Sequence, residues 1–195
     1  MTASLRRIRA LTDTGQPGAI VSDLDGVLRV FDDQLWEQLD EELEAEPGTS
    51  FAAILAHPFL EEGTRGRGTH AQWRERAAEH LTESGIDPEQ ARATVRRWAD
   101  TPAVVDQAVL TLLLEARAQG VPVFVLTNGT DRVREEIEAL DLAPVIGPDG
   151  QFLLNSAELG HAKPEQEAFR LAHQRIEQTL GRELEPQEIV FLDDT

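Results

Sequence analysis

Four short apolar runs along the chain have the length and residue types of buried parallel strands. They comprise Ala19-Ile20-Val21, residues 121–126, residues 152–154 and residues 189–192, and turn residues or helical patterns flank them. Because strands and helices alternate, the pattern predicts an α/β fold with a doubly wound parallel sheet. One helix should follow the second run, and another should precede the fourth with Pro164 in its first turn. Their apolar positions at helical spacing are Val133, Ile137 and Leu140, and then Phe169, Ala172, Ile176 and Leu180.

The first and second runs are separated by about 90 residues, which is more than a simple crossover helix needs. Three apolar helical faces in this stretch predict an inserted helical bundle, with the tryptophans mostly in its core. We therefore divide the chain into an α/β core (1–30 and 102–195) and a helical insert (31–101). Within the insert, residues 63–68 resemble a flexible basic linker, and residues 102–119 are expected to form the helix that leads into the second strand. The three faces are Leu35, Trp36, Leu39 and Leu43; Trp73, Ala77 and Leu81; and Ala91, Val95 and Trp98.

Composition narrows the possible chemistry. The formal net charge of −18 argues against nucleic acid or an anionic membrane as the main partner. The chain has no cysteine, so a bound metal would need oxygen or imidazole ligands, and Mg²⁺ is the default. No stretch reaches the roughly 18 apolar residues of a membrane span, and residues 5–9 lack the apolar core of a signal peptide. We expect a cytoplasmic protein. Lys163 is its only lysine among 18 basic residues.

A particular polar group follows each apolar run. In open α/β sheets the carboxyl ends of the strands meet at one crevice, so these groups should converge. Several carboxylates at short range would need neutralisation, for which a divalent cation and one ammonium group are suited. A carboxylate nucleophile beside Mg²⁺ is typical of phosphoryl transfer through an aspartyl phosphate. The groups are Asp23 and Asp25; Thr127, Asn128 and Gly129; His161, Lys163 and Pro164; and Asp193 and Asp194.

These motifs, in this order, resemble those of the haloacid dehalogenase superfamily, in the subgroup with a helical cap between the first two motifs. The resemblance implies that Asp23 is the nucleophile and that Asp25 protonates the leaving group and then activates water. It implies a catalytic role for Thr127 and Lys163, substrate contacts near Asn128 and Gly129, and a magnesium site. The metal ligands would be Asp23, the carbonyl oxygen of Asp25, Asp193 and Asp194, whereas His161 is expected to be a loop residue.

The activity implied by the resemblance is Mg²⁺-dependent hydrolysis of a small phosphorylated metabolite by a monomer or homodimer. A 2-haloacid dehalogenase, a phosphomutase and a catalytically weak binding protein stay open, although Asp25 and the paired acids favour phosphate over a carbon–halogen bond. A receiver domain fits poorly, because its phospho-acceptor lies away from its acid pair and it has no long helical insert. The superfamily continues past its last acids, so we expect part of the core to be missing after Thr195.

Overall fold

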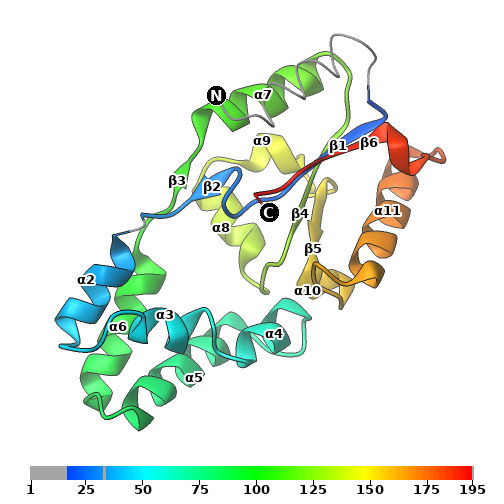
Figure 1. The fold of residues 1–195 in the computed structure, drawn as a ribbon. Helices are drawn as coiled ribbons and strands as arrows, with labels where there is room; N and C mark the ends of the chain where they lie inside the picture. The colour runs from blue at the N-terminus through cyan, green and yellow to red at the C-terminus, as the bar shows by residue number, and fades with distance from the viewer. Residues whose placement is uncertain (1–16, 33, 195) are drawn as a thin grey trace.

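The computed structural model describes residues 17–32 and 34–194 (Figure 1). The predictions made for residues 5–9 and for Thr195 therefore lie outside the described residues. Among the helices of the described part, none is both long enough and apolar enough to cross a membrane.

A parallel sheet of four strands in the order β5-β4-β1-β6 confirms the predicted α/β fold class. In the centre of the sheet, Ile20 of β1 pairs with Val123 on one side and with Val190 on the other. The predicted run 189–192 matches β6, and the other runs differ from their strands by one or two residues at an end. The strands are β1 (Ala19–Ser22), β4 (Val123–Thr127), β5 (Leu153–Asn155) and β6 (Ile189–Leu192).

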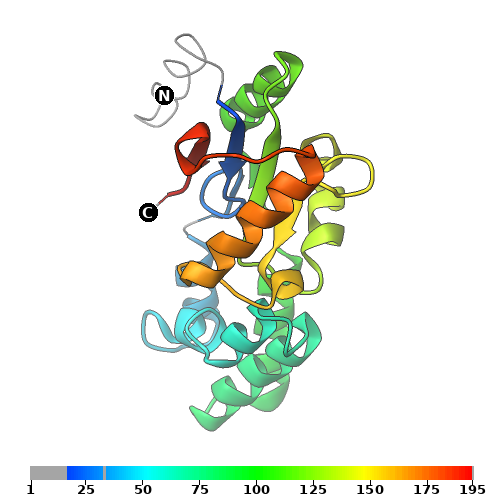
Figure 2. The same cartoon turned by 90° about the vertical axis from the view of Figure 1, so that its right-hand side faces the viewer.

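Helices cover both faces of this sheet, because side chains along each strand alternate between the two faces. Ile20, Val123 and Val125 pack with the helices α7, α8 and α9. Val21 and Phe124 pack on the opposite face with α11, which Figures 1 and 2 show running along that side. The helices of the α/β part are α7 (Gln107–Ala118), α8 (Val133–Ala139), α9 (Ala143–Ile146), α10 (Ser156–Leu159), α11 (Gln166–Leu180) and the 3₁₀ turn η1 (Pro186–Glu188).

Between β1 and β4 the chain forms a group of helices with its own apolar cluster, as the insert pattern predicted. Trp73 is buried in this cluster and donates a hydrogen bond from Nε1 to the carbonyl oxygen of Ile54 at 2.8 Å. Trp36 and Trp98 pack against the cluster, so all three tryptophans contribute to its core. Figure 1 shows the helices gathered at one end of the molecule. They are α2 (Leu35–Glu42), α3 (Thr49–Ile54), α4 (Phe59–Thr64), α5 (His70–Glu83) and α6 (Pro88–Asp100).

A two-stranded antiparallel ribbon joins the insert to the sheet part, and the sequence pattern missed it. It consists of β2 (Arg29–Val30) and β3 (Val104–Val105). The prediction of a helix over 102–119 was therefore wrong at its start. β-branched valines favour an extended backbone. Asp106 then begins α7 as its N-cap, accepting hydrogen bonds from the N–H groups of Ala108 and Val109 at 2.9 and 3.0 Å.

One further local prediction was wrong, and another was only partly right. Pro164 is not in the first turn of α11: the helix begins at Gln166, and its N-cap Glu165 still has an extended backbone. The segment 63–68 begins within α4, which continues to Thr64, and only residues 65–68 form the connection to α5, with both arginines in ion pairs. Arg67 pairs with Glu62 at 2.8 Å, and Arg65 pairs with both Glu61 and Glu165. The glycine-rich composition of residues 63–68 gave no indication of these ion pairs.

Candidate active site

Asp23 occupies the position directly after β1, at the carboxyl end of the sheet. Its N–H group donates to the carbonyl oxygen of Leu192 at 2.7 Å, which continues the pairing of β1 with β6 by one residue. One carboxylate oxygen accepts a hydrogen bond from the N–H group of Leu24, also at 2.7 Å. The residue is buried, with 8% of its surface exposed. Two strands and a main-chain hydrogen bond thus fix the carboxylate.

The ammonium group of Lys163 lies between two of the predicted site carboxylates. Its Nζ atom is 2.6 Å from Oδ2 of Asp23 and 3.0 Å from Oδ2 of Asp193. Burial raises the pKa of Asp23, the hydrogen bond and charge of Lys163 lower it, and the net result is a pKa above the usual value. The repulsion from Asp193 adds to the upward shift. The lysine therefore offsets only part of the cost of burying this carboxylate.

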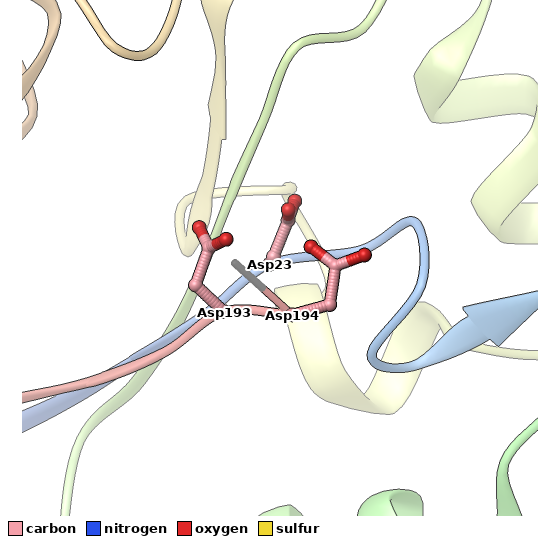
Figure 3. A group of neighbouring side chains, drawn as sticks. All are labelled: Asp23, Asp193 and Asp194. Carbon is pink, nitrogen blue, oxygen red and sulfur yellow. The ribbon is translucent and has the colours of Figure 1, made fainter.

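Asp23, Asp193 and Asp194 form a group of three carboxylates that could hold a cation. One oxygen from each residue lies within 4.8 Å of the others. Figure 3 shows the three side chains projecting to the same side of the ends of β1 and β6. Hard carboxylate oxygens are the donor type that Mg²⁺ prefers. The predicted side-chain ligands Asp23, Asp193 and Asp194 are thus brought together. The carboxylate of Asp25 is not in this group, and the predicted ligand from that residue was its carbonyl oxygen.

Gly26 leaves room for Asp194 in this arrangement. Its backbone has a φ of +79°, which favours glycine, and an added Cβ atom would overlap with Oδ2 of Asp194. The glycine of the first motif is therefore needed for the position of the last motif, 168 residues further along the chain by the difference of the two residue numbers.

Asn128 joins the second motif to the third. Its side-chain oxygen accepts a hydrogen bond from the N–H group of Lys163 at 2.7 Å, and its amide nitrogen donates to the carbonyl oxygen of Lys163 at 2.9 Å. This two-point contact holds the turn that carries Lys163 against the end of β4. In this structure the side chain of Asn128, predicted as a substrate contact, is thus engaged with Lys163.

Thr127 and Gly129 lie on either side of Asn128. Thr127 is the last residue of β4 and is 1% exposed. A Cβ atom added to Gly129 would come within 2.8 Å of Cβ of Val133 and of Oδ1 of Asn155, so this position admits only glycine without a shift of its neighbours. The close packing brings the main chain after β4 against the start of α8.

Asp25 interacts with Arg29, a residue that the sequence reasoning did not single out. The guanidinium group binds both carboxylate oxygens of Asp25, with Nε to Oδ1 at 2.5 Å and Nη2 to Oδ2 at 2.9 Å. Its Nη1 atom donates to Oε2 of Glu136 in α8 at 2.7 Å. The spacing of Asp25 and Arg29 could have indicated the first pair, but no pattern indicates Glu136, 107 residues away.

The insert contacts the sheet part close to the turn that carries Lys163. Arg65, at the end of α4, forms an ion pair with Glu165 at 2.6 Å. Oε2 of Glu165 also accepts a hydrogen bond from Nδ1 of the His161 ring at 2.8 Å, so His161 is a loop residue with a carboxylate partner. Gly66 lies against α10, where a Cβ atom would overlap with the carbonyl oxygen of Ala157.

The comparison with protein families gives a match over residues 17–195 to the family described as haloacid dehalogenase-like hydrolase. The chain therefore belongs to the haloacid dehalogenase-like hydrolases, as its motifs predicted. A comparison with curated proteins gives no match.

Solved structures of the superfamily have the same fold. A haloacid dehalogenase family enzyme, BT-2542 from Bacteroides thetaiotaomicron, described as a magnesium complex, is 21% identical with a TM-score of 0.63 over 93% of this chain and 85% of that one. The same enzyme described with magnesium and inorganic phosphate is 22% identical, with a TM-score of 0.62 over 92% and 85%. L-2-haloacid dehalogenase from Xanthobacter autotrophicus, with chloropropionic acid covalently bound, is 19% identical with a TM-score of 0.54 over 90% and 69%.

Proposed function

We propose that this hydrolase is a Mg²⁺-dependent phosphatase that acts on a small phosphorylated metabolite through an aspartyl phosphate on Asp23. One observation carries the proposal: the Asp23 carboxylate contacts Lys163 and lies within 4.8 Å of two further carboxylates, Asp193 and Asp194. Displacement at a carbon–halogen bond does not need such a cluster, whereas a phosphoryl group brings negative charge that a cation would balance. The structure of BT-2542 in complex with magnesium and inorganic phosphate also favours a magnesium-dependent phosphatase over a dehalogenase.

The acidic group fits a magnesium ion by its chemistry. Its three members are aspartates, and the adjoining Lys163 leaves the set with a net negative charge. Asp23, Asp193 and Asp194 would hold the ion, with the carbonyl oxygen of Asp25 as a further ligand. When bound, Mg²⁺ would reduce the repulsion between the nucleophile and the phosphoryl oxygens.

The reaction would proceed in two displacements at phosphorus. First, an oxygen of Asp23 bonds to phosphorus while the bond from phosphorus to the ester oxygen breaks, and Asp25 gives its proton to the departing oxygen. A water molecule then attacks the phosphorus, Asp25 takes a proton from it, and phosphate leaves as the Asp23 carboxylate is restored. The Thr127 hydroxyl and the N–H groups near Asn128 and Gly129 would bind the phosphoryl oxygens, with Lys163 balancing their charge.

The helical insert, residues 31–101, would act as a cap that closes over the substrate and selects it. The contacts of Arg65 with Glu165 and of Gly66 with Ala157 support this proposal, because they bring α4 next to the residues that follow β5. A cap in contact with the core would also exclude water from the reacting groups.

The experiment is hydrolysis of p-nitrophenyl phosphate with Mg²⁺ and with EDTA. We expect turnover only with Mg²⁺, and a phosphorylated protein on acid quenching. Asp23→Asn should remove both signals with the fold intact by circular dichroism, whereas Asp149→Asn, in an exposed turn, should leave them unchanged. Full activity of Asp23→Asn would exclude Asp23 as the nucleophile. Halide release from a 2-haloacid without metal would establish the dehalogenase reaction instead.

A further inference from the structure

Arg29 is buried between two carboxylates that belong to distant parts of the chain. The residue is 9% exposed, and each of its three guanidinium nitrogens has a carboxylate partner. Nε and Nη2 bind Asp25, and Nη1 binds Glu136. An arginine with a carboxylate on each of its three guanidinium nitrogens is poorly placed to bind substrate as well. Its function therefore lies in its effect on Asp25 and Glu136.

The backbone around Arg29 also holds it in place relative to Asp25. The N–H group of Arg29 donates to the carbonyl oxygen of Leu24 at 2.7 Å, and its own carbonyl oxygen accepts from Gly26 at 2.8 Å. Residues 24–29 thus form a closed loop in which Asp25 and Arg29 are bridged by main chain and side chain alike. The loop ends in β2, the strand that leads into the insert.

Burial lowers the pKa of Arg29, but the hydrogen bonds and charges of Asp25 and then of Glu136 outweigh it and raise the pKa. The guanidinium group stays charged, and its planar fork matches the two oxygens of one carboxylate. A lysine could supply the charge but not the two parallel hydrogen bonds.

We propose that Arg29 is a positioning residue that orients the Asp25 carboxyl group for proton transfer, releasing one of its two hydrogen bonds when that oxygen carries the proton, and that Glu136 holds the guanidinium group in its orientation. The inference rests on the proposed function, because it assumes that Asp25 serves as acid and base. Geometric placement of an acid matters most when the departing oxygen needs its proton, and much less when the leaving group is stable as an anion.

The test compares two esters by kcat/KM, which reports the steps up to the first irreversible one. An alkyl phosphate needs a proton on its leaving oxygen, and 2,4-dinitrophenyl phosphate does not. We expect Arg29→Gln to lower kcat/KM for the alkyl ester by about a hundredfold and for the dinitrophenyl ester by at least tenfold less. Arg29→Lys, which keeps the charge, should give an intermediate loss of the same kind, and Glu136→Gln a smaller one.

The matched control is Arg134→Gln on α8, where Arg134 forms an exposed ion pair with Glu138; both esters should be unaffected. Should Arg29→Gln fail to fold, Arg29→Lys and Glu136→Gln carry the comparison. Equal losses on the two esters in these variants would overturn the positioning role while the wild-type activity upheld the proposed function. A wild-type protein that hydrolyses neither ester would overturn both.

Discussion

Replacement of Lys163 by methionine removes an ammonium group that contacts both Asp23 and Asp193. The side chains of Lys163 and Asp23 are 11% and 12% exposed, and that of Asp193 is 20% exposed, so water can replace the lost contacts only in part. Methionine keeps most of the apolar stem. The substitution therefore isolates the charge from the packing.

The expected loss follows from the contact geometry. At 2.6 Å and an effective dielectric constant of about 20, the attraction between Lys163 and Asp23 is about 6 kcal/mol before desolvation is subtracted. Removal of one partner of a buried pair typically costs about 3–5 kcal/mol. Because Asp193 is partly hydrated, we expect the free energy of unfolding to fall by about 3 kcal/mol at pH 7.5 in EDTA.

Two conditions should reduce this loss. Mg²⁺ should stabilise Lys163→Met more than the wild type, because the ion would bind the uncompensated carboxylates more tightly. A lower pH should do the same. The pKa of Asp23 is already raised in the folded state, so its contribution to stability is present at low pH and is lost as the pH rises through that pKa. Removal of the lysine should raise the pKa of Asp23 further, so a lower pH should stabilise Lys163→Met more than it stabilises the wild type.

The measurement is urea unfolding followed by far-ultraviolet circular dichroism. Tryptophan fluorescence would report on the wrong region, because Trp36, Trp73 and Trp98 all lie in the insert. Arg170→Met serves as the control, since Arg170 forms an exposed pair with Glu167 and its removal should cost less than about 1 kcal/mol. A Lys163→Met protein as stable as the wild type in EDTA, or equally stabilised by Mg²⁺, would refute the reasoning.

Two other predictions follow from single side chains. Gly26→Ala should weaken Mg²⁺ binding by at least about tenfold in calorimetry, because Cβ would displace the Asp194 carboxylate; unchanged affinity would exclude Asp194 as a ligand. Burial lowers the pKa of His70 below its ordinary value of about 6.5, so the stability it confers is present above about pH 6.5 and is lost as the pH falls through its folded pKa. In urea unfolding between pH 7.5 and pH 5, His70→Gln should therefore lose less free energy of unfolding than the wild type, and parallel pH curves would contradict the assignment.

Much of the sheet and of the site could be predicted because local sequence determines them. A run of apolar residues such as 121–126, most of which lies in the buried strand β4, is most stable when covered by helices, and the polar residue directly after it then lies at the strand end. Parallel strands then bring their carboxyl ends to one edge, which is why Asp23 and Asp193 meet although they are far apart in sequence. Lys163 reaches both from the turn between α10 and α11. No long-range information was needed for that step beyond the fold class.

Other features depend on partners that no local pattern indicates. Val104 and Val105 were assigned to a helix because the partner strand Arg29–Val30 is 74 residues away at the nearest paired positions, by the difference of the residue numbers. Arg65 was read as part of a linker because Glu165 is 100 residues further along the chain. Their partners decide the conformation in both cases.

The sequence by itself determined which chemical groups are present and on which strand ends they lie, because burial of apolar runs and the polarity of turns are local properties. Only the tertiary structure decided which of those groups contact one another. It placed Asp23, Asp193 and Asp194 together beside Lys163, and it paired Asp25 with Arg29 instead. The reason is physical: contacts of 2.5 to 3.0 Å between side chains depend on rotamers and on the packing of distant elements, which a pattern of residue types does not encode.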